Sequence, residues 1–211
     1  MIYQENAFIN CPFDNSYFPL LKPLLFTLIY NNINPQISET SDSGEFRLSQ
    51  IKRLISNSKY SIHDLSRMEP LKDNDLPRFN MPFECGIDFG LKLSDDKLYS
   101  DKKILILEKE KHRYKQVISD ISGNDIFAHE NNPEKIIKVV RDWFKTQKTN
   151  IPGYKEIWLE YNDFSYKNDK VLKKAGLDSN DFEALPFSEI IENMKTWIEK
   201  RKIETAHNKG S

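Results

Sequence analysis

The sequence predicts an α/β fold, built as a doubly wound parallel sheet of about five strands with a helical C-terminal extension. Short apolar runs alternate five times with amphipathic segments over residues 7–149, the pattern of a parallel sheet with crossover helices. Ile104 to Leu107 is a run of four apolar residues without alternation, as in a central strand buried on both faces. After Thr149 the composition changes at Pro152 and Gly153. We therefore expect an α/β domain over residues 1–149 and a helical extension over residues 150–211.

The charge balance argues against two classes of partner. The chain has 31 basic and 32 acidic residues, a net charge of −1, and no block of like charge. We therefore expect no membrane association and no nucleic-acid partner. The two cysteines, Cys11 and Cys85, are far apart in the sequence, and neither a signal peptide nor a long apolar run is evident. These features predict free thiols and a cytoplasmic location.

The first half of the chain predicts three strands and two helices. Ala7 to Asn10 is a short strand that ends at a Cys-Pro-Phe-Asp segment. A helix is expected over Tyr17 to Tyr30, with Pro19 in its first turn and Pro23 as a kink. A weak second strand at Gln36 to Glu39 and a third strand at Tyr60 to Leu65 flank a helix. The apolar side of that helix carries Leu48, Ile51, Leu54 and Ile55.

A helix that begins near residue 80 carries the most informative acidic residue. Asn80 is a good N-cap, and Pro82 is tolerated in a first turn. Phe83, Ile87 and Leu91 repeat at four-residue spacing, and Gly86 and Gly90 would let the helix lie close to a sheet. Glu84 would then lie in the first turn, where the helix dipole favours its ionised form. The preceding connection over residues 66–79 is long enough to be a lid or binding loop.

The second half predicts two more strands and the extension. Ile104 to Leu107 is the fourth strand, residues 108–124 form a loop, and Asp125 to His129 is the fifth strand. Pro133 then opens a helix with an apolar face. The extension is expected to hold a short helix over residues 167–175 and an amphipathic helix from Ser188. That last helix either covers the sheet edge or forms an interface in a homo-oligomer.

Doubly wound sheets bind ligands beyond the carboxyl ends of their strands, and polar segments follow four of the predicted elements there. The segments span Asn10 to Asp14, Asp42 to Arg47, His63 to Arg67 and Arg78 to Glu84. Their carboxylates belong to Asp14, Asp42, Asp64 and Glu84, and their guanidinium groups to Arg47, Arg67 and Arg78. Carboxylates hold ribose hydroxyls and guanidinium groups pair with phosphate, so the sequence predicts a nucleotide site.

Each of these residues also has a purely structural interpretation. Glu84 could be only a favourable charge in a first turn, Asp64 could cap a loop, and His63 could be a hydrogen-bonded core histidine. Cys85 has no neighbouring histidine and is interpreted as a packing residue. No zinc spacing, phosphate-binding glycine loop or dinucleotide-binding fingerprint is present, so we expect no metal and no bound cofactor.

Four motifs resemble those of a known group of proteins. They are Phe8 to Asp14, Asp42-Ser43-Gly44 with Arg47, Ile62 to Arg67, and Arg78 to Glu84. Together they are similar to a set of bacterial proteins in the nucleoside 2-deoxyribosyltransferase and TIR group, over roughly residues 6 to 145. Phe83-Glu84-Cys85-Gly86 is similar to the deoxyribosyltransferase segment in which a Glu precedes a Gly, and Pro12-Phe13 is similar to the segment after their first strand.

The resemblance implies an enzyme acting at an N-glycosidic bond. Bacterial TIR-like proteins cleave NAD or cyclise its ADP-ribose portion in anti-phage signalling. The resemblance therefore implies NAD as the leading substrate. It also implies, as a partner, an effector protein that responds to the product. Glu84 would be catalytic, by stabilising an oxocarbenium ion or forming a covalent sugar intermediate. The expected substrate-binding residues are Asn10, Pro12, Phe13, Asp14, Asp42, Ser43, Arg47, His63, Asp64, Ser66, Arg78, Asn80 and Met81.

Three alternatives to an NAD-cleaving enzyme remain. The chain has Asn-Met-Pro before Glu84 where deoxyribosyltransferases have a Ser-Gly-Thr type of segment, so deoxyribose transfer is one alternative rather than the first expectation. The same edge of the sheet could bind a nucleotide without catalysis, as in a sensor. The domain could also serve only assembly. The overall expectation is a flavodoxin-like sheet with a nucleotide at its carboxyl edge.

Overall fold

A computed structural model describes residues 3–39, 44–68, 70, 76–116, 118–174, 176 and 185–209. Asp42 and Ser43, two of the expected substrate-binding residues, lie outside these ranges, as does most of the central part of the connection over residues 66–79 that was expected to form a lid.

Five parallel strands form one sheet in the order β2-β1-β3-β4-β5. The strands are β1 (Asn6–Asn10), β2 (Asn34–Gln36), β3 (Tyr60–Asp64), β4 (Lys103–Glu108) and β5 (Ile126–Ala128). This order and the all-parallel pairing confirm the predicted flavodoxin-like α/β fold. The register pairs Asn10 with His63, Asp64 with Leu107 and Glu108 with Ala128, so the carboxyl ends of four strands lie at one edge.

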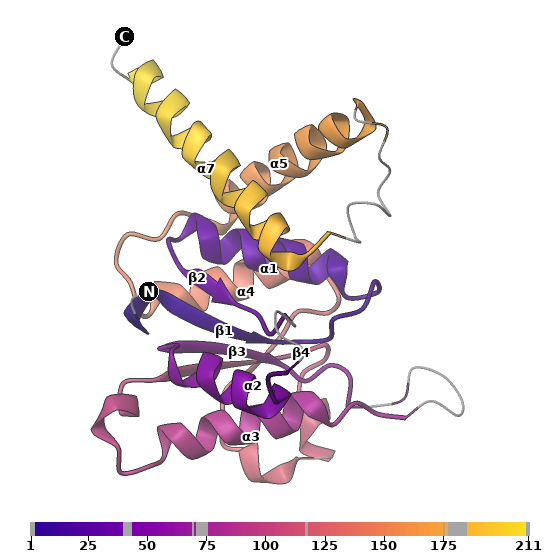
Figure 1. Ribbon diagram of the computed structural model, residues 1–211, viewed down its shortest axis with the longest axis vertical. Helices are drawn as coiled ribbons and strands as arrows, with labels where there is room; N and C mark the ends of the chain where they lie inside the picture. The colour runs from indigo at the N-terminus through magenta and orange to yellow at the C-terminus, as the bar shows by residue number, and fades with distance from the viewer. Residues whose placement is uncertain are drawn as a thin grey trace.

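Helices cover both faces of the sheet (Figure 1). The helices are α1 (Phe18–Tyr30), α2 (Arg47–Ser56), α3 (Asn80–Lys92), α4 (Pro133–Lys145), α5 (Tyr154–Lys174) and α7 (Phe187–Lys209). Short 3-10 turns lie at Tyr3–Glu5, Lys97–Tyr99, Arg113–Gln116 and Ser119–Ile121. Figure 1 shows α1 and α4 on one face and α2 and α3 on the other, with α5 and α7 beyond α1. Within the described residues, no helix combines the length and apolarity needed to cross a membrane.

The sequence explains the helix that connects β1 to β2. Pro19 lies at the start of α1, where a missing N–H costs nothing, as predicted. Pro23 lies inside the helix, and the Thr27 hydroxyl donates to its carbonyl oxygen over 2.7 Å. Leu21, Leu24, Leu25 and Leu28 are fully buried. The apolar stripe therefore outweighs the cost of the internal proline.

The C-terminal helices share the main core with the α/β part. The ring of Phe26 in α1 lies 5.5 Å from the Tyr161 ring and 5.6 Å from the Phe164 ring in α5, and 5.8 Å from the Trp197 ring in α7, between centroids. α5 is much longer than the helix predicted over residues 167–175, because its Ile157 and Phe164 are also buried against this core. α7 begins at Phe187, one residue before the predicted start.

Two element predictions were wrong in position. The second strand ends at Gln36, and Glu39 lies beyond it, where its carboxylate accepts a hydrogen bond from the backbone of Phe187 at the start of α7. In α3 the N-cap is Phe79 rather than Asn80, so Glu84 lies in the second turn.

The buried face of α3 also differs from the predicted one. Of the predicted face, Ile87 and Leu91 are partly buried against the core whereas Phe83 is exposed, and the buried positions are Met81, Glu84, Cys85 and Asp88. Gly86 and Gly90 are exposed, and a Cβ at either would meet nothing within 4 Å, so neither glycine serves a close approach to the sheet. The cause is that two acidic residues occupy interior positions, which a search for apolar periodicity does not detect.

Candidate functional site

The strand order reverses between β1 and β3, and the carboxyl ends of these two strands mark the usual ligand crevice of such sheets. β1 ends at Asn10 and β3 ends at Asp64. The first turns of α2 and α3 open at the same edge, because both helices run antiparallel to the strands. This edge therefore collects the described members of the predicted site.

Glu84 is a buried carboxyl group, and no polar partner for it occurs among the described residues. Only 8% of the residue is exposed. Its carboxylate makes no hydrogen bond or ion pair with the residues that the structure describes. Burial raises the pKa of Glu84 to about 7, against the opposing charge of Arg47. The prediction that the helix start favours the ionised form was therefore wrong, since loss of hydration outweighs the helix dipole here.

The charge of Arg47 reaches Glu84, and exposed aromatic side chains lie at the starts of α2 and α3. Arg47 is the first residue of α2, and it is exposed. The side chains of Phe46, Phe79 and Phe83 are also exposed, at the starts of α2 and α3. Exposed aromatic rings at the starts of these two helices offer surfaces on which a planar base can stack.

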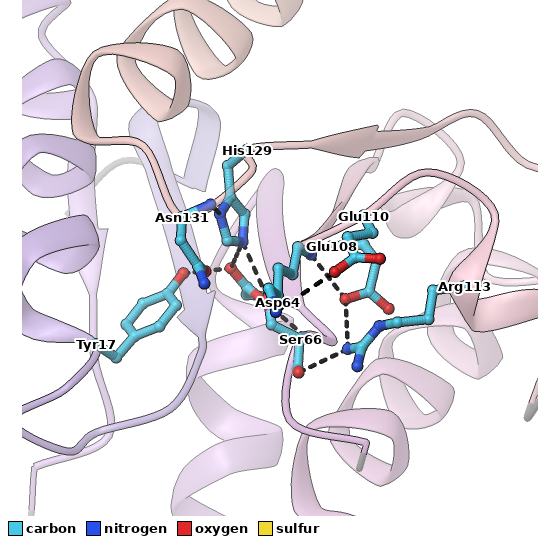
Figure 2. A network of polar contacts seen from close by, with 9 residues as sticks. Tyr17, Asp64, Ser66, Glu108, Glu110, Arg113, His129 and Asn131 are labelled. Atoms are coloured by element: carbon cyan, nitrogen blue, oxygen red, sulfur yellow. Dashed lines mark hydrogen bonds and ion pairs between the residues drawn. The ribbon is translucent and has the colours of Figure 1, made fainter. Parts of the chain in front are cut away.

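Asp64 is the centre of a buried polar network (Figure 2). Its carboxylate accepts hydrogen bonds from the Tyr17 hydroxyl and from the backbone N–H and hydroxyl of Ser66, and it pairs with His129 Nε2 at 3.0 Å. Burial alone would raise the pKa of Asp64, but the hydrogen bonds from His129, Ser66 and Tyr17 outweigh burial and lower it. With both oxygens engaged, Asp64 joins the ends of β3 and β5 to the start of α1.

The tautomer of His129 excludes a nucleophilic relay. His129 Nδ1 accepts a hydrogen bond from the backbone N–H of Asn131 over 3.1 Å, so Nε2 carries the hydrogen. Ser66 Oγ and Asp64 both contact this same Nε2, each at 3.0 Å. In a Ser-His-Asp triad the hydroxyl and the carboxylate contact opposite ring nitrogens. The arrangement therefore holds the loops in place and does not activate Ser66.

A second buried chain of contacts supports the start of α3. Asn10 Nδ2 donates to His63 Nδ1 over 2.9 Å and to the carbonyl oxygen of Met81 over 2.8 Å. His63 Nε2 contacts Asp88 at 3.0 Å, and Asp88 pairs with Lys102 Nζ at 3.1 Å. The side chains of His63, Asp88 and Lys102 are fully buried. Asn10 and His63 thus lie behind the crevice and fix the helix turn that leads to Glu84.

Asp14 forms an ion-pair cluster at the mouth of the crevice. It lies 3.1 Å from Arg67 Nη2 and 3.3 Å from Arg78 Nη1. Arg78 is half exposed, whereas Arg67 is mostly buried. The two arginines therefore meet at one carboxylate, although only Arg78 was included among the expected binding residues.

The thiol of Cys11 lies within electrostatic reach of three carboxylates. Burial raises the pKa of Cys11 well above its usual value, and the charges of Asp64, Glu84 and Asp14 raise it further. All three carboxylates consequently lie within electrostatic reach of the segment that follows β1.

The remaining predicted residues divide between the core and the surface. Pro12 is buried, and Phe13 packs against Phe187 of α7 with ring centroids 5.4 Å apart. Met81 is buried and contributes its carbonyl oxygen to Asn10, whereas Asn80 is exposed at the start of α3. Ser66 lies in the Asp64 network.

Several polar residues of this region escaped the sequence analysis. Tyr17, Asp88, Lys102, Glu108, Arg113 and His129 all take part in the buried contacts described here. Glu108 ends β4, and its carboxylate pairs with Arg113 at 2.7 Å; His129 directly follows β5. The rule for carboxyl ends, applied to the last two strands, would have identified both. Nothing in the local sequence marks Tyr17 or Lys102.

A cavity of about 510 Å³ opens beside this network. It is lined by Ser16, Tyr17, Pro19, Leu20, Ser66, Arg67, Pro70, Lys109, Arg113 and Asn131. No cluster of three or more His, Cys, Asp or Glu side chains able to hold a metal ion occurs in the described ranges.

A scan against protein-family models, a search of curated proteins and a search of solved structures found no match to the chain.

Proposed function

We propose that the protein is an enzyme that cleaves, or transfers a sugar at, the N-glycosidic bond of a nucleotide, with NAD as the leading substrate. The observation that carries the proposal is Glu84, a carboxyl group that is 8% exposed and unpaired within the described chain, at the ligand edge of the sheet. Burying such a group is costly, because an ionised carboxylate loses several kcal/mol of hydration on burial, and perturbed buried carboxyl groups concentrate at functional sites.

The raised pKa suits the reaction. With a pKa of about 7, roughly half of the Glu84 carboxyl groups are ionised at neutral pH. The ionised form stabilises positive charge on the sugar as the bond from C1′ to the base nitrogen breaks. From NAD the nicotinamide leaves as a neutral molecule, taking the bonding electron pair with it. Water or a sugar hydroxyl then adds at C1′, and its proton passes to Glu84.

The surroundings of Glu84 match the other parts of a nucleotide. The charge of Arg47, at the start of α2, reaches Glu84, and a guanidinium group can pair with an anionic part of the substrate. Phe46, Phe79 and Phe83 provide exposed rings for a base. Asp64 cannot hold ribose hydroxyls in this arrangement, since Tyr17, Ser66 and His129 occupy its oxygens. In the proposal it instead positions the loops around the crevice.

The first test is base release from NAD and from a panel of nucleosides and nucleotides, followed by chromatography and mass spectrometry. Wild type is expected to release free base, and Glu84→Gln to lose at least about 100-fold of this activity, because the amide cannot stabilise the developing charge. Glu192→Gln, a change of an exposed carboxylate on α7, is the matched control and should retain full activity.

The sugar product distinguishes hydrolysis, cyclisation and transfer. Full activity in Glu84→Gln would exclude the mechanism. A different result would favour a nucleotide-binding sensor over an enzyme. In that case wild type releases no base, but one nucleotide raises the melting temperature of both wild type and Glu84→Gln.

A further inference from the structure

We propose that the cavity between α1 and the loops after β3, β4 and β5 binds the phosphate groups of the nucleotide. This inference makes two claims: that the cavity binds phosphate, and that the phosphate belongs to the nucleotide substrate. The second claim rests on the proposed function. The phosphate part concerns a different set of residues from those around Glu84; of its cations, Arg67 lies in one of the polar segments expected at this edge, whereas Lys109 and Arg113 were not expected there.

Three cationic side chains from separate loops line the cavity. Arg67 follows β3, Lys109 follows β4, and Arg113 lies in the turn after it. No acidic residue is among the described residues of the lining. The hydroxyls of Ser16 and Ser66 and the amide of Asn131 add neutral donors. Cations and donors from several loops, without a lining carboxylate, are the groups that recognise phosphate.

Carboxylates behind the cavity wall hold the two arginines in place. Asp14 pairs with Arg67 at 3.1 Å, and Glu108 pairs with Arg113 at 2.7 Å, yet neither acid lines the cavity. Arg113 Nη2 also donates to the carbonyl oxygen of Ser66 over 2.7 Å (Figure 2). Guanidinium groups that are already oriented lose little side-chain entropy when an anion binds.

Arg67 keeps donors for a ligand. Its contacts with Asp14 and Ser16 both use Nη2. A guanidinium group has five N–H donors, and those on Nη1 and Nε make no hydrogen bond within the described chain. The start of α1 also borders the cavity through Tyr17, Pro19 and Leu20, so the positive end of that helix dipole points toward it.

The cavity and Glu84 belong to one continuous edge. Asp14 meets Arg67 of the cavity through Oδ1 and Arg78, which precedes α3, through Oδ2. Cys11 lies within the electrostatic reach of Glu84, Asp64 and Asp14. A nucleotide with its glycosidic bond at Glu84 would thus extend its phosphates past Asp14 toward Arg67.

The test is binding by isothermal titration calorimetry, in the Glu84→Gln background so that turnover does not affect it. The probes are ADP, inorganic pyrophosphate and adenosine. We expect ADP to bind, adenosine to bind at least about tenfold more weakly, and added salt to weaken ADP binding, as for an interaction carried by charge.

Arg67→Gln and Lys109→Gln should each weaken ADP binding by about ten- to a hundredfold, the usual loss for one charged hydrogen bond. The matched controls are Lys111→Gln, in the same loop but outside the lining, and Arg53→Gln on α2; both should bind like the parent. An equal loss in the controls, or equal binding of adenosine and ADP, would overturn the phosphate site. Pyrophosphate binding as tightly as ADP would overturn its assignment to a nucleotide. Because no step needs catalysis, failure of base release leaves this test intact.

Discussion

At the scale of single residues, the two central carboxyl groups lie in opposite environments. Asp64 is fully buried but accepts hydrogen bonds from three residues, so its pKa is lowered despite burial. Glu84 is nearly as buried, lacks such donors in the described chain, and has a pKa raised to about 7. The pair shows that hydrogen bonds, rather than burial alone, decide which buried acid stays ionised. The residue left without donors is the one that can exchange a proton near neutral pH.

This difference predicts how stability depends on pH. A carboxyl group with a higher pKa in the folded than in the unfolded state binds more protons when folded, so the free energy of unfolding falls as pH rises from about 4.5 to about 7. The full shift corresponds to about 3 kcal/mol. Glu84→Gln should remove this loss and be more stable than wild type at pH 8, measured by urea unfolding at pH 5 and pH 8.

The matched control for the pH experiment is Glu110→Gln, which alters an exposed carboxylate. Its stability should follow the wild-type pH dependence. Parallel curves for Glu84→Gln and wild type would show that the Glu84 carboxyl group is hydrated in solution, contrary to its burial in the structure.

At the scale of secondary-structure elements, α3 is held by polar contacts on both sides. Its Met81 carbonyl accepts from Asn10 at the end of β1, and its Asp88 contacts His63 of β3 and Lys102 before β4. Lys102 Nζ also donates to the carbonyl oxygen of Ile55 over 2.9 Å, at the end of α2. These contacts join three strands and two helices, and they fix the helix that carries Glu84.

The buried pair of Asp88 and Lys102 should therefore be strongly coupled. Asp88→Asn and Lys102→Met should each cost about 3–5 kcal/mol of stability, because each leaves an unpaired charge in the interior. The double variant should cost less than the sum by about 1–3 kcal/mol. Denaturant unfolding of the four proteins gives this coupling energy.

The exposed pair of Lys138 and Asp142, four residues apart in α4, is the control. Its coupling energy should be only about 0.5 kcal/mol, since water screens both groups. Equal coupling in the two pairs would mean that the chain through Asp88 does not hold α3 in place.

The same elements show what the sequence could and could not predict. β1, β3 and β4 were predicted to within one or two residues; in β1 and β4 the reason is a continuous apolar run, which identifies a buried parallel strand. The rule for carboxyl ends placed Asn10, Asp64 and Glu84 at one edge. The buried face of α3 was predicted only in part: Ile87 and Leu91 do pack against the core, but Phe83 is exposed, and Asp88 takes an interior position through partners that lie far away in the sequence. Apolar periodicity contains no information about such partners.

At the scale of the whole molecule, the C-terminal helices and the sheet share one core. Phe26 and Phe144, on the α1 and α4 side of the sheet, are fully buried together with Ile157 of α5 and Met194 of α7. Removal of α5 and α7 would expose this apolar surface to water at about 25 cal/mol per Å². The chain is therefore expected to unfold as one cooperative unit, although residues 1–149 and 150–211 differ in architecture.

Tryptophan fluorescence can test this expectation in two places. The chain has three tryptophans, Trp143 in α4, Trp158 in α5 and Trp197 in α7. Replacing two of them by Phe leaves either Trp143 or Trp197 as the single probe. Each variant should give a single urea transition at the midpoint of its own far-UV circular dichroism transition, because α4 and α7 contribute to the same core. An earlier transition for the Trp197 probe than for the circular dichroism of the same variant would show that α7 detaches first. The helical extension would then be a separate folding unit, free to release the face of α1 that it now covers.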